Sequence, residues 1–193
     1  MSTFPVYSNN RFIRGTYGGK LRLGQIAWYE EAPQVGSVTA LLGATTLAAA
    51  DVTVLRSGFT KPDVPRCLVV KPNAATVTGT TVGLEGINSN GQPITESVTT
   101  NGTAAVVTTK AFARLTAITL PARSATGNTI SIGTANVLGL YHALHGDLRL
   151  QTLFDGVADL GTLAQHATDV AKNLFTPAGT LDGTKILRIV YVV

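Results

Sequence analysis

The stretch from residue 64 to residue 140 constrains the fold most strongly, because short runs of Thr, Val and Ile alternate there with frequent turn signals. Asn88-Ser89-Asn90-Gly91 separates two of these runs, and such residues tolerate the positive φ of a tight hairpin turn. Short strands at this spacing are typical of a β-sandwich or barrel. We therefore predict a mainly β protein with an antiparallel, sandwich or barrel-like body.

Two later runs show the alternation of half-buried strands. In Ile118-Thr119-Leu120 and in Ile130-Ser131-Ile132, the apolar residues share a parity and Thr or Ser takes the place between them. A period of two puts the apolar side chains on one face of a strand. Each run is predicted to bury one face and expose the other.

Changes in composition divide the chain into three parts. Residues 1–35 are predicted to form an extended N-terminal arm, and residues 36–140 the β body. Residues 141–193 are predicted to form a short α/β C-terminal segment. Within it, the sequence of residues 159–174 predicts a short helix, weakened by Gly161 and two threonines. Residues 185–193 are largely β-branched and predict a final strand that rejoins the body.

Sparse charge and high hydrophobicity indicate a chain that works in an assembly. Only 13% of the residues are charged and 45% are hydrophobic, so a monomer would struggle to cover its apolar surface. No apolar run approaches the roughly 20 residues needed to span a membrane. The N-terminus also lacks the pattern of a secretory signal, and no membrane partner is predicted.

The net charge of +4 is spread along the chain. Residues 1–35 hold four basic and two acidic residues, residues 36–140 seven and four, and residues 141–193 four and five. No block of like charge and no basic pattern on a helix accompanies this excess. A complementary acidic protein surface is therefore favoured as partner over nucleic acid.

Aromatic and basic residues are interleaved near the N-terminus, where six of the 12 aromatic residues precede residue 30. This mixture suits an arm that anchors rings and guanidinium groups on another subunit. An arm that folds back on its own body is an equal alternative. The predicted partner-binding residues are Phe12, Arg14, Tyr17, Arg22, Trp28 and Tyr29.

No combination of residues predicts catalysis or a cofactor. Cys67 is the only cysteine and has no histidine near it in sequence, which favours a small buried apolar role. His142, His145 and Asp147 offer too few converging ligands for a metal site. Three further aspartates lack the spacing of an EF-hand loop: Asp155, Asp159 and Asp169. The chain is predicted not to be an enzyme.

Several motifs between residues 40 and 140 resemble those of a family of tailed-bacteriophage virion proteins, and residues 181–193 share the resemblance more weakly. In chain order the motifs are Pro62-Asp63-Val64-Pro65-Arg66, Val77-Thr78-Gly79, Gly91-Gln92-Pro93-Ile94-Thr95-Glu96, Asn101-Gly102-Thr103, Thr109-Lys110-Ala111-Phe112, Ile118-Thr119-Leu120-Pro121-Ala122-Arg123 and Leu138-Gly139-Leu140. Proteins of this family are often capsid decoration, or cement, proteins. The resemblance brings no catalytic residues with it and implies assembly.

The resemblance implies a decoration protein made in the bacterial host cytoplasm and located on the outer capsid surface of the virion. Its partners would be the major capsid protein, whose neighbouring subunits it would bridge, and other copies of itself, as a trimer rather than a dimer. A tail, baseplate or head–tail connector protein is the alternative within structural proteins. A carbohydrate-binding adhesion module is a further alternative, which the scarcity of aromatic residues after Tyr29 disfavours.

Overall fold

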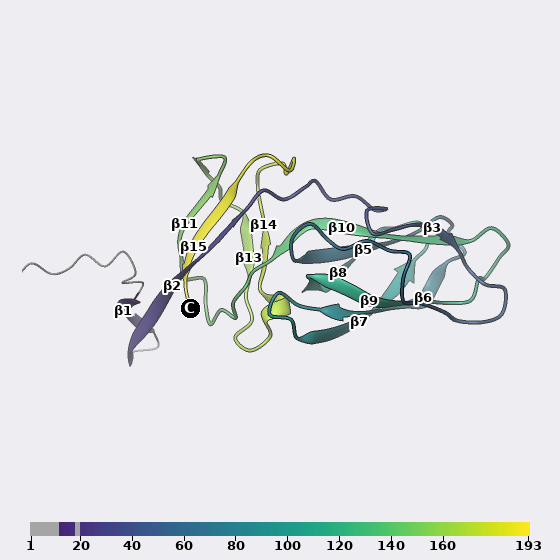
Figure 1. Cartoon of the computed structure of the whole chain (residues 1–193), viewed down its shortest axis with the longest axis horizontal. Helices are drawn as coiled ribbons and strands as arrows, with labels where there is room; N and C mark the ends of the chain where they lie inside the picture. Colours follow the sequence, from purple (N-terminus) through teal and green to yellow (C-terminus); the bar gives the residue numbers. More distant parts are fainter. Residues whose placement is uncertain (1–11, 18–19) are drawn as a thin grey trace, which may run out of the picture.

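Three antiparallel sheets follow one another along an elongated molecule (Figure 1). The computed structural model of the chain describes residues 12–17 and 20–193. Two of the sheets pack together as a body at one end, and a five-stranded sheet with a projecting hairpin forms the other end. The prediction of a mainly β protein with an antiparallel, sandwich-like or barrel-like body is confirmed.

The body is a sandwich of a six-stranded and a four-stranded sheet. The six-stranded sheet has the order β13-β14-β10-β5-β8, with β3 also paired to β10. Its strands are β3 (Leu42–Thr46), β5 (Arg66–Pro72), β8 (Val106–Phe112), β10 (Thr129–Gly139), β13 (Thr162–Ala164) and β14 (Leu174–Thr176). The four-stranded sheet has the order β4-β9-β6-β7, with β4 (Thr53–Leu55), β6 (Thr78–Ile87), β7 (Pro93–Asn101) and β9 (Arg114–Leu120).

The core of the sandwich consists mainly of aliphatic side chains from both sheets. Leu68 and Ile132 from the six-stranded sheet pack in one cluster with Leu84, Ile118 and Leu120 from the four-stranded sheet. All five are almost completely buried. The alternation read in residues 118–120 thus places the apolar positions in the core, although Ala117 is buried as well.

The turn at residues 88–91 forms as its sequence predicts. β6 and β7 pair on either side of it, and Gly91 has a φ of +75°. The carboxamide oxygen of Asn88 accepts hydrogen bonds from the backbone N–H of Asn90 at 2.9 Å and of Gln92 at 3.0 Å. The asparagine side chain therefore closes the turn that the glycine makes possible.

β10 is buried on both faces, which differs from the half-buried strand predicted for residues 129–133. Residues 130–135 are all buried. The second face is covered by residues 36–38, which cross so close above Gly133 that a Cβ there would collide with the backbone of Ser37 and Val38. Ser131, on the same strand, donates to the carbonyl of Lys71 at 3.2 Å. The strand is therefore covered because the chain crosses over it at a glycine.

The third sheet, called here the small sheet, joins the two ends of the chain. Its order is β1-β2-β15-β11-β12, with β1 (Phe12–Tyr17), β2 (Lys20–Glu31), β11 (Arg149–Phe154), β12 (Val157–Ala158) and β15 (Leu187–Val192). Its inner face packs on a second core that contains Tyr29, Phe154, Ile189 and Tyr191 as well as Leu138 of β10. β10 therefore contributes to both cores.

The final strand differs from the prediction that it rejoins the body. β15 pairs with β2 on one side and β11 on the other, not with the strands of residues 36–140. Leu187, Ile189 and Tyr191 are buried while Arg188 is exposed, so the strand buries one face, as an antiparallel sheet with an open side allows. Instead, β13 and β14 of the C-terminal segment extend the body sheet.

The short helix predicted in residues 159–174 is not formed. That segment contains β13 and a single 3₁₀ turn, η1 (Val170–Lys172). Asn173 donates to the carbonyls of His166 at 2.9 Å and Asp169 at 2.8 Å, and Asp159 accepts from the backbone N–H of Gly161 at 2.6 Å. These side chains satisfy the backbone locally, in competition with the hydrogen bonds that a helix would need.

Candidate interaction site

The outer face of the small sheet exposes an apolar band. Opposite residues on antiparallel strands point to the same face, and the register pairs Ile26 with Val192 and Trp28 with Val190. Trp28 is 49% exposed, and the other three are partly exposed. We call these four residues the Trp28 face. Their inner-face neighbours on the same strands form the second core, so the sheet has one packed side and one exposed side.

An ion pair borders the Trp28 face. Arg188 donates to both carboxylate oxygens of Glu30, from Nε and from Nη2, each at 2.9 Å. These hydrogen bonds hold the pKa of Glu30 below its ordinary value. Because both side chains remain about half exposed, the pair adds little to stability. Its charges cancel, which leaves the face apolar and locally neutral.

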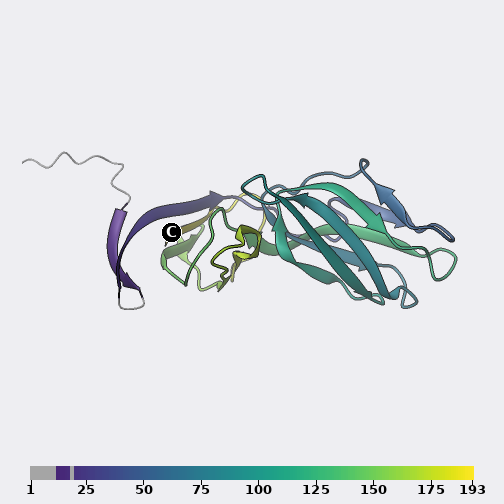
Figure 2. The ribbon, with the colours of Figure 1, turned by 90° about the horizontal axis from the view of Figure 1, so that it is seen from below.

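A two-stranded ribbon projects beyond the small sheet (Figures 1 and 2). β15 accompanies β2 only as far as Gln25, whose backbone exchanges hydrogen bonds with Val193 at 3.0 and 2.9 Å. Residues 20–24 of β2 continue past this point and pair with β1 alone. We call β1 together with residues 20–25 of β2 the ribbon. At about 3.3 Å per residue, its six-residue strands extend roughly 20 Å.

The predicted partner-binding residues are divided between the ribbon and the small sheet. Phe12, Arg14 and Tyr17 belong to β1 and Arg22 to β2, so all four are on the ribbon, although their side chains lie outside the described part of the structure. Trp28 lies on the outer face of the sheet.

Tyr29 faces the interior, so the structure does not place it where a partner could bind. Adjacent residues of a strand point to opposite faces, and the exposure of Trp28 therefore requires the burial of Tyr29. Its ring stacks on Tyr141 with 5.5 Å between the centroids, and Tyr141 donates to a carboxylate oxygen of Glu31 at 2.6 Å. Burial raises the pKa of Tyr29.

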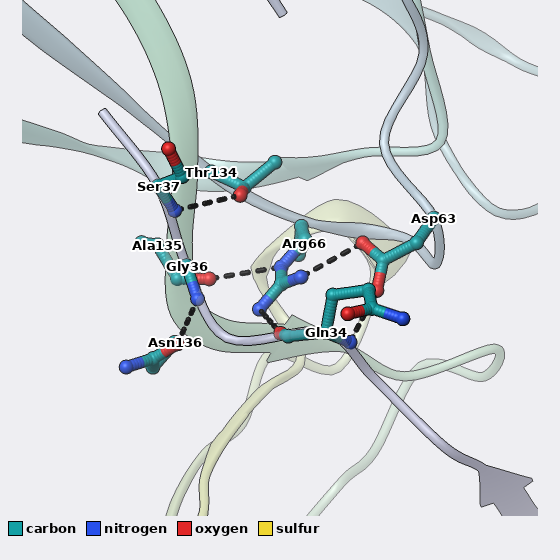
Figure 3. Close-up of polar contacts among 8 residues, drawn as sticks. All are labelled: Gln34, Gly36, Ser37, Asp63, Arg66, Thr134, Ala135 and Asn136. Carbon is teal, nitrogen blue, oxygen red and sulfur yellow. Dashed lines mark hydrogen bonds and ion pairs between the residues drawn. The ribbon is translucent and has the colours of Figure 1, made fainter. Parts of the chain in front are cut away.

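A buried arginine joins the small sheet to the body (Figure 3). Arg66 is completely buried and donates to three oxygens: the carbonyl of Ala135 at 2.9 Å, the carboxylate of Asp63 at 2.7 Å and the carbonyl of Gln34 at 3.0 Å. Asp63 in turn accepts from the backbone N–H of Gln34 at 2.7 Å. The sequence did contain a signal for this cluster: a lone arginine at the start of an apolar run, three residues after an aspartate.

The segment after Gln34 is fixed along β10 by further hydrogen bonds (Figure 3). The N–H of Gly36 donates to the side-chain oxygen of Asn136 at 2.6 Å, and the N–H of Thr134 donates to the carbonyl of Ser37 at 2.8 Å. Together with Arg66, these contacts hold the connection between β2 and β3 at both sides. The small sheet is therefore presented at a fixed orientation relative to the body.

Three residues that the sequence offers as candidates for catalysis or metal binding lie in ordinary structural surroundings. His142 Nδ1 lies 3.0 Å from the hydroxyl of Tyr191, and desolvation lowers the pKa of this histidine. Asp147 binds Arg149 through two hydrogen bonds of 2.8 and 2.7 Å. Cys67 is buried, which raises its pKa to about 12. No three His, Cys, Asp or Glu side chains gather as a metal site among the described residues.

The same part of the chain contains no helix long and apolar enough to cross a membrane. In comparisons with known proteins, no protein-family model, no curated protein and no solved structure matched this chain.

Proposed function

We propose that this chain is a non-enzymatic structural protein of a tailed-phage virion, which decorates the assembled capsid shell and bridges neighbouring major capsid subunits. The Trp28 face carries the proposal. It is an exposed apolar band centred on the only tryptophan of the chain, on a sheet whose other side packs on the second core through β2, β11 and β15.

The composition of this face suits a protein partner. Tryptophan is enriched among the residues that contribute most to binding energy at protein interfaces, and the centres of interfaces are poor in charge. Here Glu30 and Arg188, which border the face, neutralise each other. An exposed apolar surface of this kind suits a contact with another protein subunit.

The rigid connection through Arg66 supports a bridging role. A decoration protein that links two subunits must hold its contacts at a fixed separation, because ordering a loose link costs conformational entropy on binding. The contacts of the buried Arg66 side chain with Asp63, Gln34 and Ala135 support that rigidity. Binding to the assembled lattice and not to free subunits would then stabilise the shell by mass action.

The resemblance supports the same proposal, and the structure accounts for some of its motif residues. Asp63 and Arg66 belong to the motif at residues 62–66 and form the buried cluster. Gly91 and Gly102, from two other motifs, have positive φ angles in turns. We place the protein on the outer capsid surface, after synthesis in the host cytoplasm, on the strength of this resemblance.

Binding to purified shells that lack the protein tests the proposal. Trp28→Ala should weaken binding by about 2 kcal/mol or more, roughly thirtyfold, if the residue is a hot spot. Val107→Ala is the matched control, because Val107 is 44% exposed on the body strand β8. This control should bind like the wild type, and the thermal melts of both variants should show that they fold.

Equal binding by the wild type and Trp28→Ala would contradict the proposed surface. The copy number per virion distinguishes a capsid decoration protein from a tail, baseplate or connector protein. Hundreds of copies would agree with decoration of the shell, whereas about a dozen or fewer would show a tail or connector protein.

A further inference from the structure

A surface hollow lies along β11, at the side of the small sheet opposite to the ribbon. Its volume is about 490 Å³, and its lining residues come from β11 and the segment around β12: Asp147, Arg149, Leu150, Gln151, Thr152, Leu153, Ala158, Asp159 and Leu160. Two of these are strongly exposed leucines, Leu150 at 55% and Leu160 at 92%. Exposed apolar residues that lie together and are bordered by polar ones mark interaction surfaces on many proteins.

We propose that the hollow receives the ribbon of a second copy of this chain, in a head-to-tail contact. The ribbon has only two strands, so a partner surface would stabilise it. β1 pairs with β2 alone, and an isolated two-stranded hairpin is at best marginally stable in water.

Charge complementarity favours this occupant. The two strands of the ribbon hold Arg14, Lys20 and Arg22 and no acidic residue, a net charge of +3. Residues 147–160, around the hollow, hold one arginine and three aspartates, a net charge of −2. Asp147 and Arg149 pair with each other, and Asp155 lies exposed in the turn between β11 and β12. The approach of the ribbon would therefore be electrostatically favourable.

The topology requires that the ribbon come from another molecule. β1 forms one edge of the small sheet, and β2 and β15 lie between it and β11. The ribbon also projects away from the sheet along β2 (Figures 1 and 2). It cannot reach the hollow of its own chain without breaking the pairing of β2 with β15. A contact between two different surfaces of identical chains either closes a ring or continues as a filament, and a ring agrees with the trimer expected from the resemblance.

Sedimentation velocity of variants at micromolar concentration tests this contact. The hollow variant is Leu160→Arg, which adds a charge of the same sign as the ribbon at a 92% exposed position. The ribbon variant is Arg14→Glu with Arg22→Glu. Val52→Arg is the control, because it adds the same charge at a 61% exposed valine of the body. Far-UV circular dichroism spectra of all variants should match that of the wild type, which would show that each variant folds.

The expected pattern is specific to a head-to-tail contact. The wild type and Val52→Arg should form the same oligomer, and the hollow and ribbon variants should each be monomeric. A mixture of these two variants should form a dimer, because one copy keeps an intact ribbon and the other an intact hollow. A monomeric wild type, an oligomeric Leu160→Arg protein or a mixture that stays monomeric would overturn the proposal. Because the Trp28 face is unchanged in these variants, shell binding can be measured separately from self-association.

Discussion

The body and the small sheet bury their cores in different ways. The core of the body is mainly aliphatic and comes from residues 41–132, so nearby segments of the chain supply most of it. The core of the small sheet includes Tyr29, Phe154, Phe175 and Tyr191, and it combines both ends of the chain with the end of β10. The two sheets of the body bury their inner faces against each other, whereas the small sheet buries one face on the second core and exposes Trp28 on the other. Under the proposed function, the body would be the scaffold and the small sheet would carry the binding surface.

Breaking the connection between the two regions should strongly destabilise the protein. Arg66→Met would remove the charged partner of Asp63 and the donor to the carbonyls of Gln34 and Ala135. Because the side chain of Asp63 is 27% exposed, we expect a loss of about 2–3 kcal/mol, below the roughly 3–5 kcal/mol of a fully buried pair. Urea unfolding would measure this loss. Arg188→Met is the control, since its exposed pair with Glu30 should be worth no more than about 1 kcal/mol. Equal losses would show that Arg66 does not clamp the two regions.

Truncation in each core tests whether the two regions unfold together. Ile132 and Ile189 are both completely buried, one in each core. Each change to Ala should cost about 2–5 kcal/mol. Because β10 contributes Ile132 to one core and Leu138 to the other, both variants should shift one cooperative transition in calorimetry. Two separate transitions, with Ile189→Ala lowering only one of them, would show that the regions are independent.

Removing the hydroxyl group should have opposite effects on stability at Tyr29 and at Tyr141. The hydroxyl of Tyr29 is buried without a hydrogen-bond partner in the described part of the chain. Tyr29→Phe should therefore raise the free energy of unfolding by about 1 kcal/mol, because a buried unsatisfied polar group is costly. Tyr141→Phe should lower it by about 1 kcal/mol, since its hydroxyl donates to Glu31. Urea unfolding of both variants would reveal the opposite signs, and two destabilised variants would contradict the packing described.

The smallest effect concerns pH and the turn that leads into β15. Hydrogen bonds from the backbone of Lys185 and Thr184 lower the pKa of Asp182 from 3.8 to about 2. A lowered carboxyl pKa contributes stability above pH 3.8, and this contribution is lost as pH falls toward 2. Asp182→Asn should therefore flatten the acid side of the stability profile. Unfolding measured across this range would test it, and an unchanged profile would contradict it.

The sequence predicts the features of the fold that depend on residues close together in the chain. The hairpin at residues 88–91 depends on Asn88 and Gly91, which act within the turn itself. The pairing of β15 with β2 links residues almost as far apart in sequence as the chain permits, and no local pattern specifies it. The prediction of a helix in residues 159–174 was wrong because hydrogen bonds that Asn173 donates and Asp159 accepts, not propensity, determine that backbone.

The candidate site was predictable in part. The richness of residues 12–29 in aromatic and basic side chains drew attention to the segment that contains the ribbon and Trp28. The rule that adjacent strand residues face opposite sides would have shown that Trp28 and Tyr29 cannot share one surface. The hollow along β11 could not be foreseen, because it depends on how β11 and β12 pair at the edge of a sheet built from distant segments.

Hydroxyl-radical footprinting of the protein on and off the shell tests the role of the Trp28 face most directly. Trp28 is the only tryptophan and is 49% exposed, so a single peptide reports on it. Its oxidation should fall several-fold when the protein binds purified shells, while Val52 of the body, 61% exposed, should react equally in both states. Protection of Val52 with unchanged oxidation of Trp28 would contradict attachment through the small sheet.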